Sequence, residues 1–278
     1  MLAALVPGVA HAGPWTPDPG HGYAKLWLTE LPGFGYHAGD GRTIGLGLYD
    51  ELSLSAYGEV GVADGLAISL HAPLVRMYFL QDTRDGSTTA HVAPGDPTLS
   101  ARWRFVRFER FVAAVQVGVK LPFAPGGVAQ TVYAGDAPHD PVGGLEVGTA
   151  VVDISGGLSF GLAWDRIYVT GGATFVGRTG GWDQVLSWSA EVGGSPFDPR
   201  FGIRARVVGW HPLIRGSELR GESPNGVSNG TEYVGVGVEG EWWLDSHWAV
   251  GGAFEGGLGA LHRQIGGPVF DVYLAAKW

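Results

Sequence analysis

The sequence contains no cysteine, few charged residues and no long apolar run. Without cysteine, the 278 residues can form no disulfide, no thiolate metal site and no cysteine nucleophile. Charged residues make up only 16% of the chain, well below the ~25% of typical soluble domains. The formal net charge of −9 provides no basic surface for nucleic acid, so no nucleic-acid partner is expected. No segment approaches the ~18 uncharged apolar residues of a membrane-spanning helix.

Glycine and aromatic residues are abundant instead. The 48 glycines are about 17% of the chain, against an average near ~7%. They follow no three-residue period, which excludes a collagen. With 45% hydrophobic and 12% aromatic residues, the chain is too apolar to remain disordered. This composition disfavours an ordinary soluble enzyme domain.

The first twelve residues have the form of an export signal. An apolar run from Leu2 to Ala10 is followed by Ala10-His11-Ala12, a small-x-small pattern typical of signal-peptidase sites. We therefore expect residues 1–12 to be a signal peptide and residues 13–21 to be a short N-terminal segment in the periplasm. The basic region that normally precedes the apolar run is missing, so either the start is truncated or the deduced start is too late. The alternative is a frayed apolar N-terminus.

The dominant period along the chain is two. Between Thr98 and Phe105, every second residue is apolar and the others are small and polar or arginine, which predicts a strand with one apolar and one polar face. The last eleven residues repeat the pattern, with Tyr273 and Lys277 on the polar face. About twelve such strands are expected, near residues 22–31, 50–62, 66–80, 96–106, 111–123, 146–163, 166–178, 183–194, 201–212, 230–243, 248–259 and 268–278.

Short and long connections alternate between these strands. Turns such as residues 63–65 and 165–166 are tight, whereas the segments near 32–49, 81–95, 124–145, 213–229 and 260–267 are mostly longer. Most strands have the length needed to cross a bilayer at a steep tilt, and no helical segment is available to cover their apolar faces. The sequence thus predicts an all-β fold, an antiparallel transmembrane β-barrel over residues 22–278 with short periplasmic turns and longer external loops, placed in the cell outer membrane.

Tryptophans gather next to the short turns. We expect them to form an interfacial girdle at the periplasmic rim, made of Trp103, Trp164, Trp242, Trp248 and Trp278, and we expect Trp243 at the same rim. A looser aromatic set is expected at the opposite rim, formed by Tyr36, Tyr78, Phe79, Phe123, Trp182 and Trp210. Pro73 within the third strand predicts a bulge.

The polar faces carry charges of both signs that would point into the lumen. Those expected in its periplasmic half are Glu59, Arg102, Arg104, Glu191, Arg204, Arg206, Glu239 and Glu241. Arg204 and Arg206 lie on a strand between neighbours that carry Glu191 and Glu239/Glu241. Two interpretations remain open, since such pairs can fill and stiffen a narrow barrel or form a constriction for a small solute.

The sequence offers little that indicates enzyme chemistry. Residues 157–161 match the G-x-S-x-G nucleophile pattern, but the period-two alternation runs straight through them, so Ser159 is expected to be an ordinary inward strand residue. The nine histidines show no ligand spacing. Neither a catalytic residue, a metal ion nor a cofactor is expected.

Four short segments resemble an outer-membrane transporter group, the phenol-degradation meta-pathway family. They are the hairpin from Tyr57 to Leu66 (YGEVGVADGL), Gly95-Asp96-Pro97, Lys120-Leu121-Pro122 and the final aromatic residue Trp278. There is looser similarity to fatty-acid and aromatic-hydrocarbon channels, which are larger and carry an N-terminal plug that residues 13–22 are too short to form. The final residue also departs from the usual Phe.

The resemblance implies passive transport of small solutes, apolar or aromatic ones included. It further implies contact with outer-membrane lipids and lipopolysaccharide, and recognition of the C-terminal strand by the barrel-assembly machinery. Two alternatives stay open: an outer-membrane lipid-modifying enzyme, and a closed structural or adhesion barrel that acts through its external loops.

Overall fold

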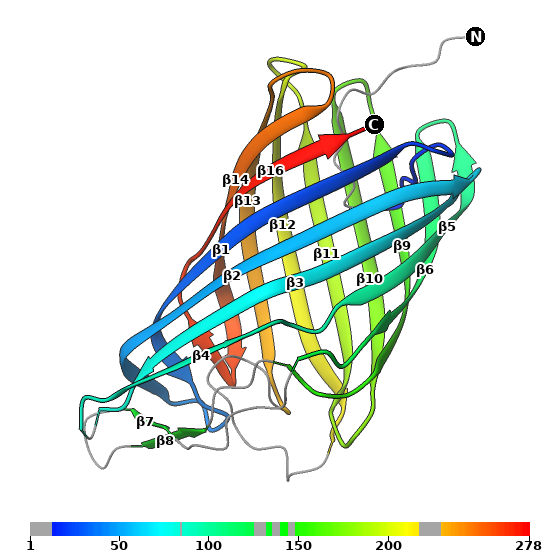
Figure 1. Cartoon of the computed structure of the whole chain (residues 1–278). Helices are drawn as coiled ribbons and strands as arrows, with labels where there is room; N and C mark the ends of the chain where they lie inside the picture. The colour runs from blue at the N-terminus through cyan, green and yellow to red at the C-terminus, as the bar shows by residue number, and fades with distance from the viewer. Residues whose placement is uncertain (1–12, 84, 125–131, 135–139, 144–147, 217–228) are drawn as a thin grey trace.

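The chain forms a ring of antiparallel strands in a computed structural model that describes residues 13–83, 85–124, 132–134, 140–143, 148–216 and 229–278 (Figure 1). The strands of the ring are β1 (Gly22–His37), β2 (Thr43–Ala63), β3 (Leu66–Gln81), β4 (Thr88–Ala93), β5 (Thr98–Phe108), β6 (Phe111–Lys120), β9 (Asp153–Ala163), β10 (Ile167–Arg178), β11 (Gln184–Gly194), β12 (Phe201–Ile214), β13 (Glu232–Trp243), β14 (Trp248–His262), β15 (Gln264–Gly266) and β16 (Val269–Lys277). The ring closes because β1 pairs with both β2 and β16.

Two wall strands are interrupted. β4 and β5 both pair with β3, and β15 and β16 both pair with β1, so each pair forms consecutive parts of one strand. The fourteen segments of the sheet therefore form twelve wall strands, which confirms the predicted all-β barrel and its strand number. A small separate pair, β7 (Val132–Ala134) and β8 (Asp140–Gly143), lies at the end opposite the termini (Figure 1). The described residues contain no helix able to cross a membrane.

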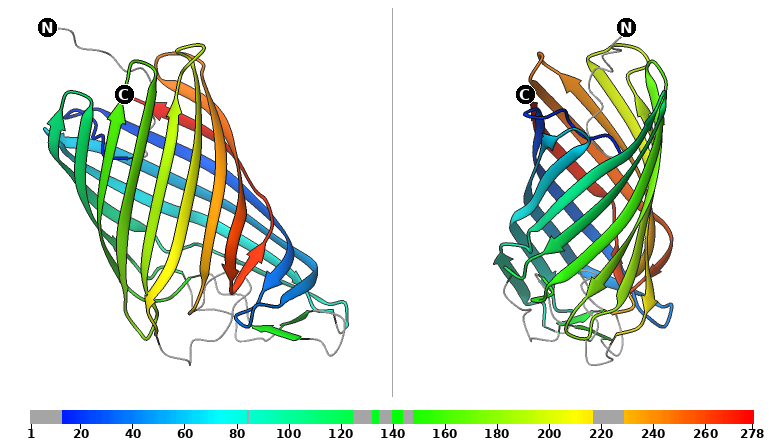
Figure 2. Two further views of the ribbon diagram at one scale, coloured as in Figure 1. Left: turned by 180° about the vertical axis from the view of Figure 1, so that it is seen from behind. Right: turned by 90° about the vertical axis from the view of Figure 1, so that its right-hand side faces the viewer.

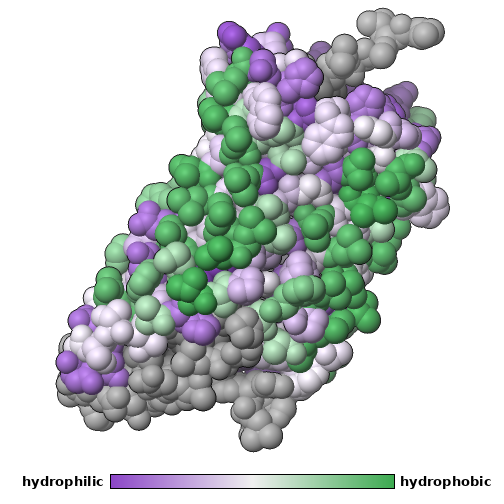
Figure 3. All heavy atoms as spheres, viewed as in Figure 1, coloured by the Kyte–Doolittle hydropathy of each residue, from purple (hydrophilic) through white to green (hydrophobic). Residues whose placement is uncertain are grey.

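Alternation of side chains sets the two faces of the wall. On β16, Val272 and Leu274 are exposed on the outside, whereas Tyr273 and Ala275, which alternate with them, are buried inside. On the face that Figure 3 shows, apolar residues gather over the middle of the barrel and hydrophilic residues toward its ends. An apolar band between polar ends is the surface that a bilayer requires.

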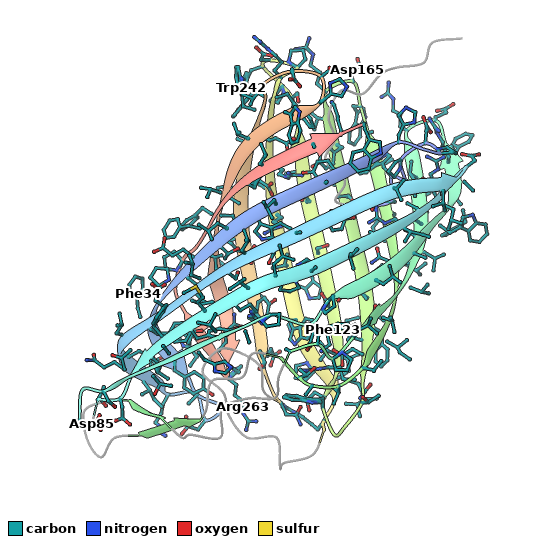
Figure 4. All side chains as sticks on the ribbon, in the orientation of Figure 1. Phe34, Asp85, Phe123, Asp165, Trp242 and Arg263 are labelled. Atoms are coloured by element: carbon teal, nitrogen blue, oxygen red, sulfur yellow. The ribbon has the colours of Figure 1, made fainter. Side chains whose placement is uncertain are left out.

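The two ends of the barrel differ. Figure 2 shows the C-terminus and the tight turns at one end, and Figure 4 places Asp165 and Trp242 at this end and Asp85 and Arg263 at the other. Short turns with both chain ends on their side are typical of the periplasmic end of an outer-membrane barrel. We use "periplasmic end" and "external end" in this sense. The expected signal peptide, residues 1–12, lies outside the described residues.

Several strand limits differ from those predicted. The expected loop at 32–49 is mostly strand, because β1 and β2 extend to a short connection at 38–42. Inward Tyr36, Ile44 and Tyr49 are buried on this extension, so packing among apolar side chains holds it. In contrast, β9 starts at Asp153 instead of near 146, since the amide of Thr149 donates to the Asp96 carboxylate in a loop.

One local prediction from the sequence is confirmed and another is partly wrong. The predicted bulge at Pro73 is present, since Pro73 pairs with Ser55 and Val75 pairs with Leu54. The external aromatic set is partly wrong. Tyr36 and Tyr78 face inward and are buried in an apolar cluster at the external end that also contains Ala38, Ile44, Tyr49, Leu80, Ala93, Ala124 and Ile265. Trp182 is buried as well.

Candidate functional site

The lumen contains ion pairs that join strands across the wall. Arg204 of β12 lies 2.6 Å from a carboxylate oxygen of Glu239 and 3.9 Å from one of Glu241, both on β13. Lys25 of β1 lies 2.8 Å from the same Glu239 and 3.7 Å from the centre of the Tyr273 ring. These side chains are largely shielded from water, so this cluster links β1, β12, β13 and β16 where charge pairing is strong.

Two further pairs skip a strand. Arg102 of β5 lies 3.0 Å from Glu59 of β2, across β3, and the Tyr57 hydroxyl donates to Glu59 at 2.7 Å. Arg206 of β12 lies 2.7 Å from Glu255 of β14, across β13. Side chains that reach over a neighbouring strand fill the interior of the barrel, as expected where the strand number is low.

The predicted lumen residues thus fall into separate groups. Arg204 meets Glu239 and Glu241 as expected from the strand order, whereas Arg206 pairs with Glu255 of β14 instead of Glu191 or Glu239. Arg104 is at the periplasmic rim and pairs with Asp64 in the β2–β3 turn, 2.9 Å away. Which residues pair across the strands depends on side-chain length and strand tilt, and a period-two pattern carries no information on either.

Glu191 on β11 differs from the other lumen carboxylates of this group. It is 7% exposed and accepts a hydrogen bond from the Tyr168 hydroxyl, 2.5 Å away. No Lys or Arg among the described residues forms an ion pair with it. A buried carboxylate with only a neutral donor is costly to keep charged.

One wall of the lumen is built from small and polar residues. A cavity of about 310 Å³ lies against β9 to β12. Its polar lining includes Arg102, Gln116, Ser159, Thr170, Thr174, Ser187, Ser189, Glu191 and Arg206. Ser159 thus faces the lumen from within a continuous strand, as predicted, and the nucleophile turn required by the hydrolase motif is absent here. The cavity thus presents many hydrogen-bonding groups beside the apolar surface of residues such as Ala173, Trp188 and Val208.

The segment before β1 lies inside the barrel. Pro14 and Thr16 are buried, the Trp15 ring packs edge-on against Tyr168 with centres 5.5 Å apart, and Arg102 donates to the Trp15 carbonyl at 3.1 Å. The chain then crosses to β2, where Pro19 forms a bridge with Gly61. We call residues 13–18 the N-terminal strap. It spans from β9 and β10 to β2 at the periplasmic end. The sequence predicts a short N-terminal segment at residues 13–21 but does not predict that part of it packs inside the barrel.

The sequence did not predict the strap, because its position depends on glycines in distant strands. A Cβ at Gly161 would lie 2.5 Å from the Trp15 ring, and a Cβ at Gly61 would overlap the carbonyl oxygens of Pro17 and Asp18. In the sequence these glycines are indistinguishable from the other glycines of the strands. An apolar Pro14-Trp15 pair in a segment expected to be solvated was the available signal.

The predicted girdle residues all lie on the outside near the periplasmic end. Trp103, Trp164, Trp242, Trp248 and Trp278 are each 41–56% exposed, and Figure 4 shows Trp242 at that end. Trp243 is an exception and its assignment was wrong. It is buried in the lumen with the Lys277 amine 3.8 Å from its ring centre, because neighbouring residues of a strand must point to opposite faces.

Among the residues that the structure describes, no three His, Asp or Glu side chains lie together in an arrangement able to hold a metal ion. The carboxylates of the lumen face arginine, lysine or hydroxyl groups. The chemistry of the described lumen is therefore that of charge pairing and hydrogen bonding.

No family model and no curated protein matches the sequence. Among solved structures, the chain is similar to an outer membrane channel from Pseudomonas putida F1, with a TM-score of 0.64 and 11% identity over 98% of this chain and 100% of that chain. It is also similar to the KdgM porin, with a TM-score of 0.50 and 9% identity over 92% of this chain and 99% of that chain. At these identities the similarity concerns the fold, which is the closed barrel of outer-membrane channels. The comparisons do not confirm the more specific resemblance to the phenol-degradation family.

Proposed function

We propose that the protein is an outer-membrane channel for the passive passage of small solutes, with polar solutes favoured. The observation that carries this proposal is the cavity of about 310 Å³ inside the barrel, lined by hydroxyl, amide and charged side chains. A solute in such a lining exchanges hydrogen bonds with water for hydrogen bonds with the wall, which keeps the barrier to entry low. The two similar structures are a channel and a porin, which supports the same class of function.

The polar lining bears on the choice of solute. The family resemblance implies apolar or aromatic solutes, but burying serine and threonine hydroxyls against an apolar solute would leave them without partners. Apolar side chains do gather at the external end, around Tyr36, Tyr49 and Tyr78. They are fully packed against one another, so they offer a closed core instead of an apolar passage.

The N-terminal strap provides the closure of the proposed channel at its periplasmic end. It occupies the end of the same small-residue wall that lines the cavity, through Gly161 and Thr170. The charged residues predicted for the periplasmic half of the lumen would form the constriction beside the strap. They are Glu59, Arg102, Arg104, Glu191, Arg204, Arg206, Glu239 and Glu241. Bracing of a closed barrel is the competing role of these residues, and a closed structural or adhesion barrel is the competing function.

Planar-bilayer conductance tests the channel and its closure together. Replacing Trp15 by Ala removes the ring that packs on Tyr168 and Gly161, so we expect more open events or a larger conductance than in the wild type. Trp103→Ala, the same substitution on the outer face, is the control and should leave the conductance unchanged. If the wild type and the Trp15 variant are both silent, the protein is a closed barrel and the channel proposal fails.

Arg204 and Arg206 separate a constriction from a brace. If they line the passage, replacing both by Gln leaves Glu239, Glu241 and Glu255 in excess and shifts the reversal potential in a salt gradient toward cation selectivity. If they only brace the wall, the same change lowers the urea midpoint, with a loss of a few kcal/mol at most, since carboxylates are left unpaired. No change in either measurement would mean that these arginines do not act in the lumen.

The remaining expectations belong to the same proposal. Export by cleavage of residues 1–12, contact of the girdle with lipid and lipopolysaccharide, and recognition of the C-terminal strand by the assembly machinery would bring this barrel to the outer membrane. An outer-membrane lipid-modifying enzyme remains the alternative if the purified protein alters lipids without conducting. The straight strand at Ser159 argues against a serine hydrolase.

A further inference from the structure

Glu191 has no arginine or lysine within ion-pair distance among the described residues, unlike three other glutamates of the lumen. Glu59, Glu239 and Glu255 each have one within 3.0 Å. Glu191 is equally buried, yet only the Tyr168 hydroxyl donates to it among the described residues. Its register neighbour Arg206 turns to Glu255 instead. A carboxylate in this position calls for a cation that the folded side chains do not supply.

Gly13 is placed where that cation is missing. A Cβ built on Gly13 would lie 2.7 Å from the Thr170 hydroxyl oxygen. Thr170 is the register partner of Glu191 across the β10–β11 pair, and directly opposed side chains of antiparallel strands lie about 5 Å apart. Gly13 and Glu191 also line the same cavity. The backbone of residue 13 therefore approaches the Glu191 carboxylate from within the lumen.

A second chain of contacts leads to the same place. The Trp15 ring packs on the Tyr168 ring, and the Tyr168 hydroxyl donates to Glu191. Arg102 holds the carbonyl of Trp15 at 3.1 Å. The strap is thus anchored two residues after Gly13, which fixes the end of the chain next to Glu191.

We propose that the α-ammonium group of Gly13, created by removal of residues 1–12, forms an ion pair with Glu191 inside the lumen. Hydrolysis of the Ala12–Gly13 peptide bond consumes one water, leaves the carboxylate on Ala12 of the released peptide and gives Gly13 a protonated amine. The Ala10-His11-Ala12 pattern places the cleavage there. Processing by the signal peptidase would then add an ion pair to the lumen, because before cleavage position 13 carries a neutral amide and Glu191 forms no ion pair with a described arginine or lysine.

Glycine suits this position for steric reasons. Gly13 has φ +126°, a conformation that side-chain-bearing residues rarely adopt, and a Cβ would collide with Thr170. Only a residue without a side chain brings the chain end this close to the β10–β11 pair. The ion pair would also fasten the strap to the wall opposite Gly61.

Chemical labelling of the purified, processed protein tests the ion pair. We expect mass spectrometry to find a mature chain that begins at Gly13. A zero-length carbodiimide should join its amine to Glu191 as an amide. Reductive methylation of the amine should be at least about ten-fold slower in the wild type than in Glu191→Gln, since the charge-assisted pair keeps the amine protonated. Glu51→Gln, which removes a lumen carboxylate at the external end, is the matched control and should label like the wild type.

Displacement of the amine provides the complementary test. One alanine inserted between Ala12 and Gly13 moves the amine away from Glu191 without touching the barrel, and its labelling rate should rise to that of Glu191→Gln. A mature chain that begins elsewhere, equal labelling of the wild type and Glu191→Gln, or absence of the cross-link would each overturn the proposal. These readouts do not depend on conduction, so a silent bilayer would refute the channel and leave the ion pair standing.

Discussion

Single glycines decide where the N-terminal strap can lie. At Gly161 on β9 the absent side chain leaves room for the Trp15 ring, whereas Gly156 on the outer face of the same strand has nothing near it. Strand propensity cannot distinguish the two glycines, because both lie within β9. They differ only in the space available for a side chain, which makes them a matched pair.

We expect Gly161→Ala to destabilise the strap and Gly156→Ala to be nearly neutral. The added methyl at Gly161 meets the Trp15 ring at 2.5 Å, and such overpacking costs about 1–3 kcal/mol unless the neighbour moves. Because Trp15 can move, the same change should also expose its ring. Trp15 fluorescence in a variant that keeps this tryptophan alone, together with the urea midpoint, measures both effects. Equal behaviour of the two alanine variants would show that Trp15 does not pack on β9.

A charged residue outside the membrane gives a prediction for pH. Asp245, in the β13–β14 turn, accepts hydrogen bonds from the amides of His247 at 2.7 Å and Trp248 at 2.8 Å. These two donors lower the pKa of Asp245 below its usual value. A lowered pKa in the folded state means that the contribution to stability is present above the unfolded pKa and is lost as the pH falls through the folded one.

Asp245→Ala should therefore lower the urea midpoint at neutral pH and have little effect at an acid pH below the folded pKa, where the wild-type carboxylate is also protonated. Asp165→Ala, in the β9–β10 turn, is the control because no described residue donates a hydrogen bond to it. A deficit in Asp245→Ala that is the same at both pH values would mean that the turn, and not the carboxylate, was perturbed.

At the scale of strands, periodicity carried most of what could be predicted. Alternation identified which residues of β5 and β16 face the lipid, and with it the inward direction of Arg204, Glu239 and Tyr273. It could not place strand ends beyond the bilayer, because the β1–β2 extension is held by Tyr36 and Tyr49 packing on other strands. Contacts between elements distant in sequence, such as Arg206 with Glu255, depend on barrel closure and tilt.

The girdle is a property of strand ends and can be measured as a depth. Trp103, Trp164, Trp242, Trp248 and Trp278 lie on the outer face beside the short turns, so their rings should sit at the headgroup level of one leaflet. Variants that retain one of these tryptophans should be quenched most strongly by lipids brominated close to the headgroups. Trp243, which faces the lumen, is the internal control and should be quenched weakly by every brominated lipid. Strongest quenching at the bilayer centre for most girdle positions would contradict the placement.

At the scale of the whole molecule, the outer and inner faces of the sheet differ in chemistry. The outer face meets lipid, while the inner face replaces a hydrophobic core by ion pairs, hydroxyls and a strap. The ring is closed through the middle of the barrel, since β1 pairs with both β2 and β16, whereas β4 pairs with β3 alone. Backbone hydrogen bonds between neighbours therefore run around the middle of the ring, the part that would lie in the bilayer.

This closure predicts a kinetically resistant barrel. The protein folded in detergent should show a β-type circular dichroism spectrum and run faster on SDS gels unheated than boiled, because the ring stays compact until heat opens all strands together.

A variant that weakens the pairing of β1 with its neighbours provides the critical comparison. Leu28→Pro on β1, where Leu28 lies between Leu54 and Val272 of the flanking strands, removes a ladder hydrogen bond at the closure. Phe197→Pro, in the exposed β11–β12 turn, is the control because its amide donates no hydrogen bond among the described residues. The Leu28 variant should lose the fast-migrating band at a lower temperature than the wild type and the control; solubility without detergent together with substantial helix content in the wild type would refute the barrel itself.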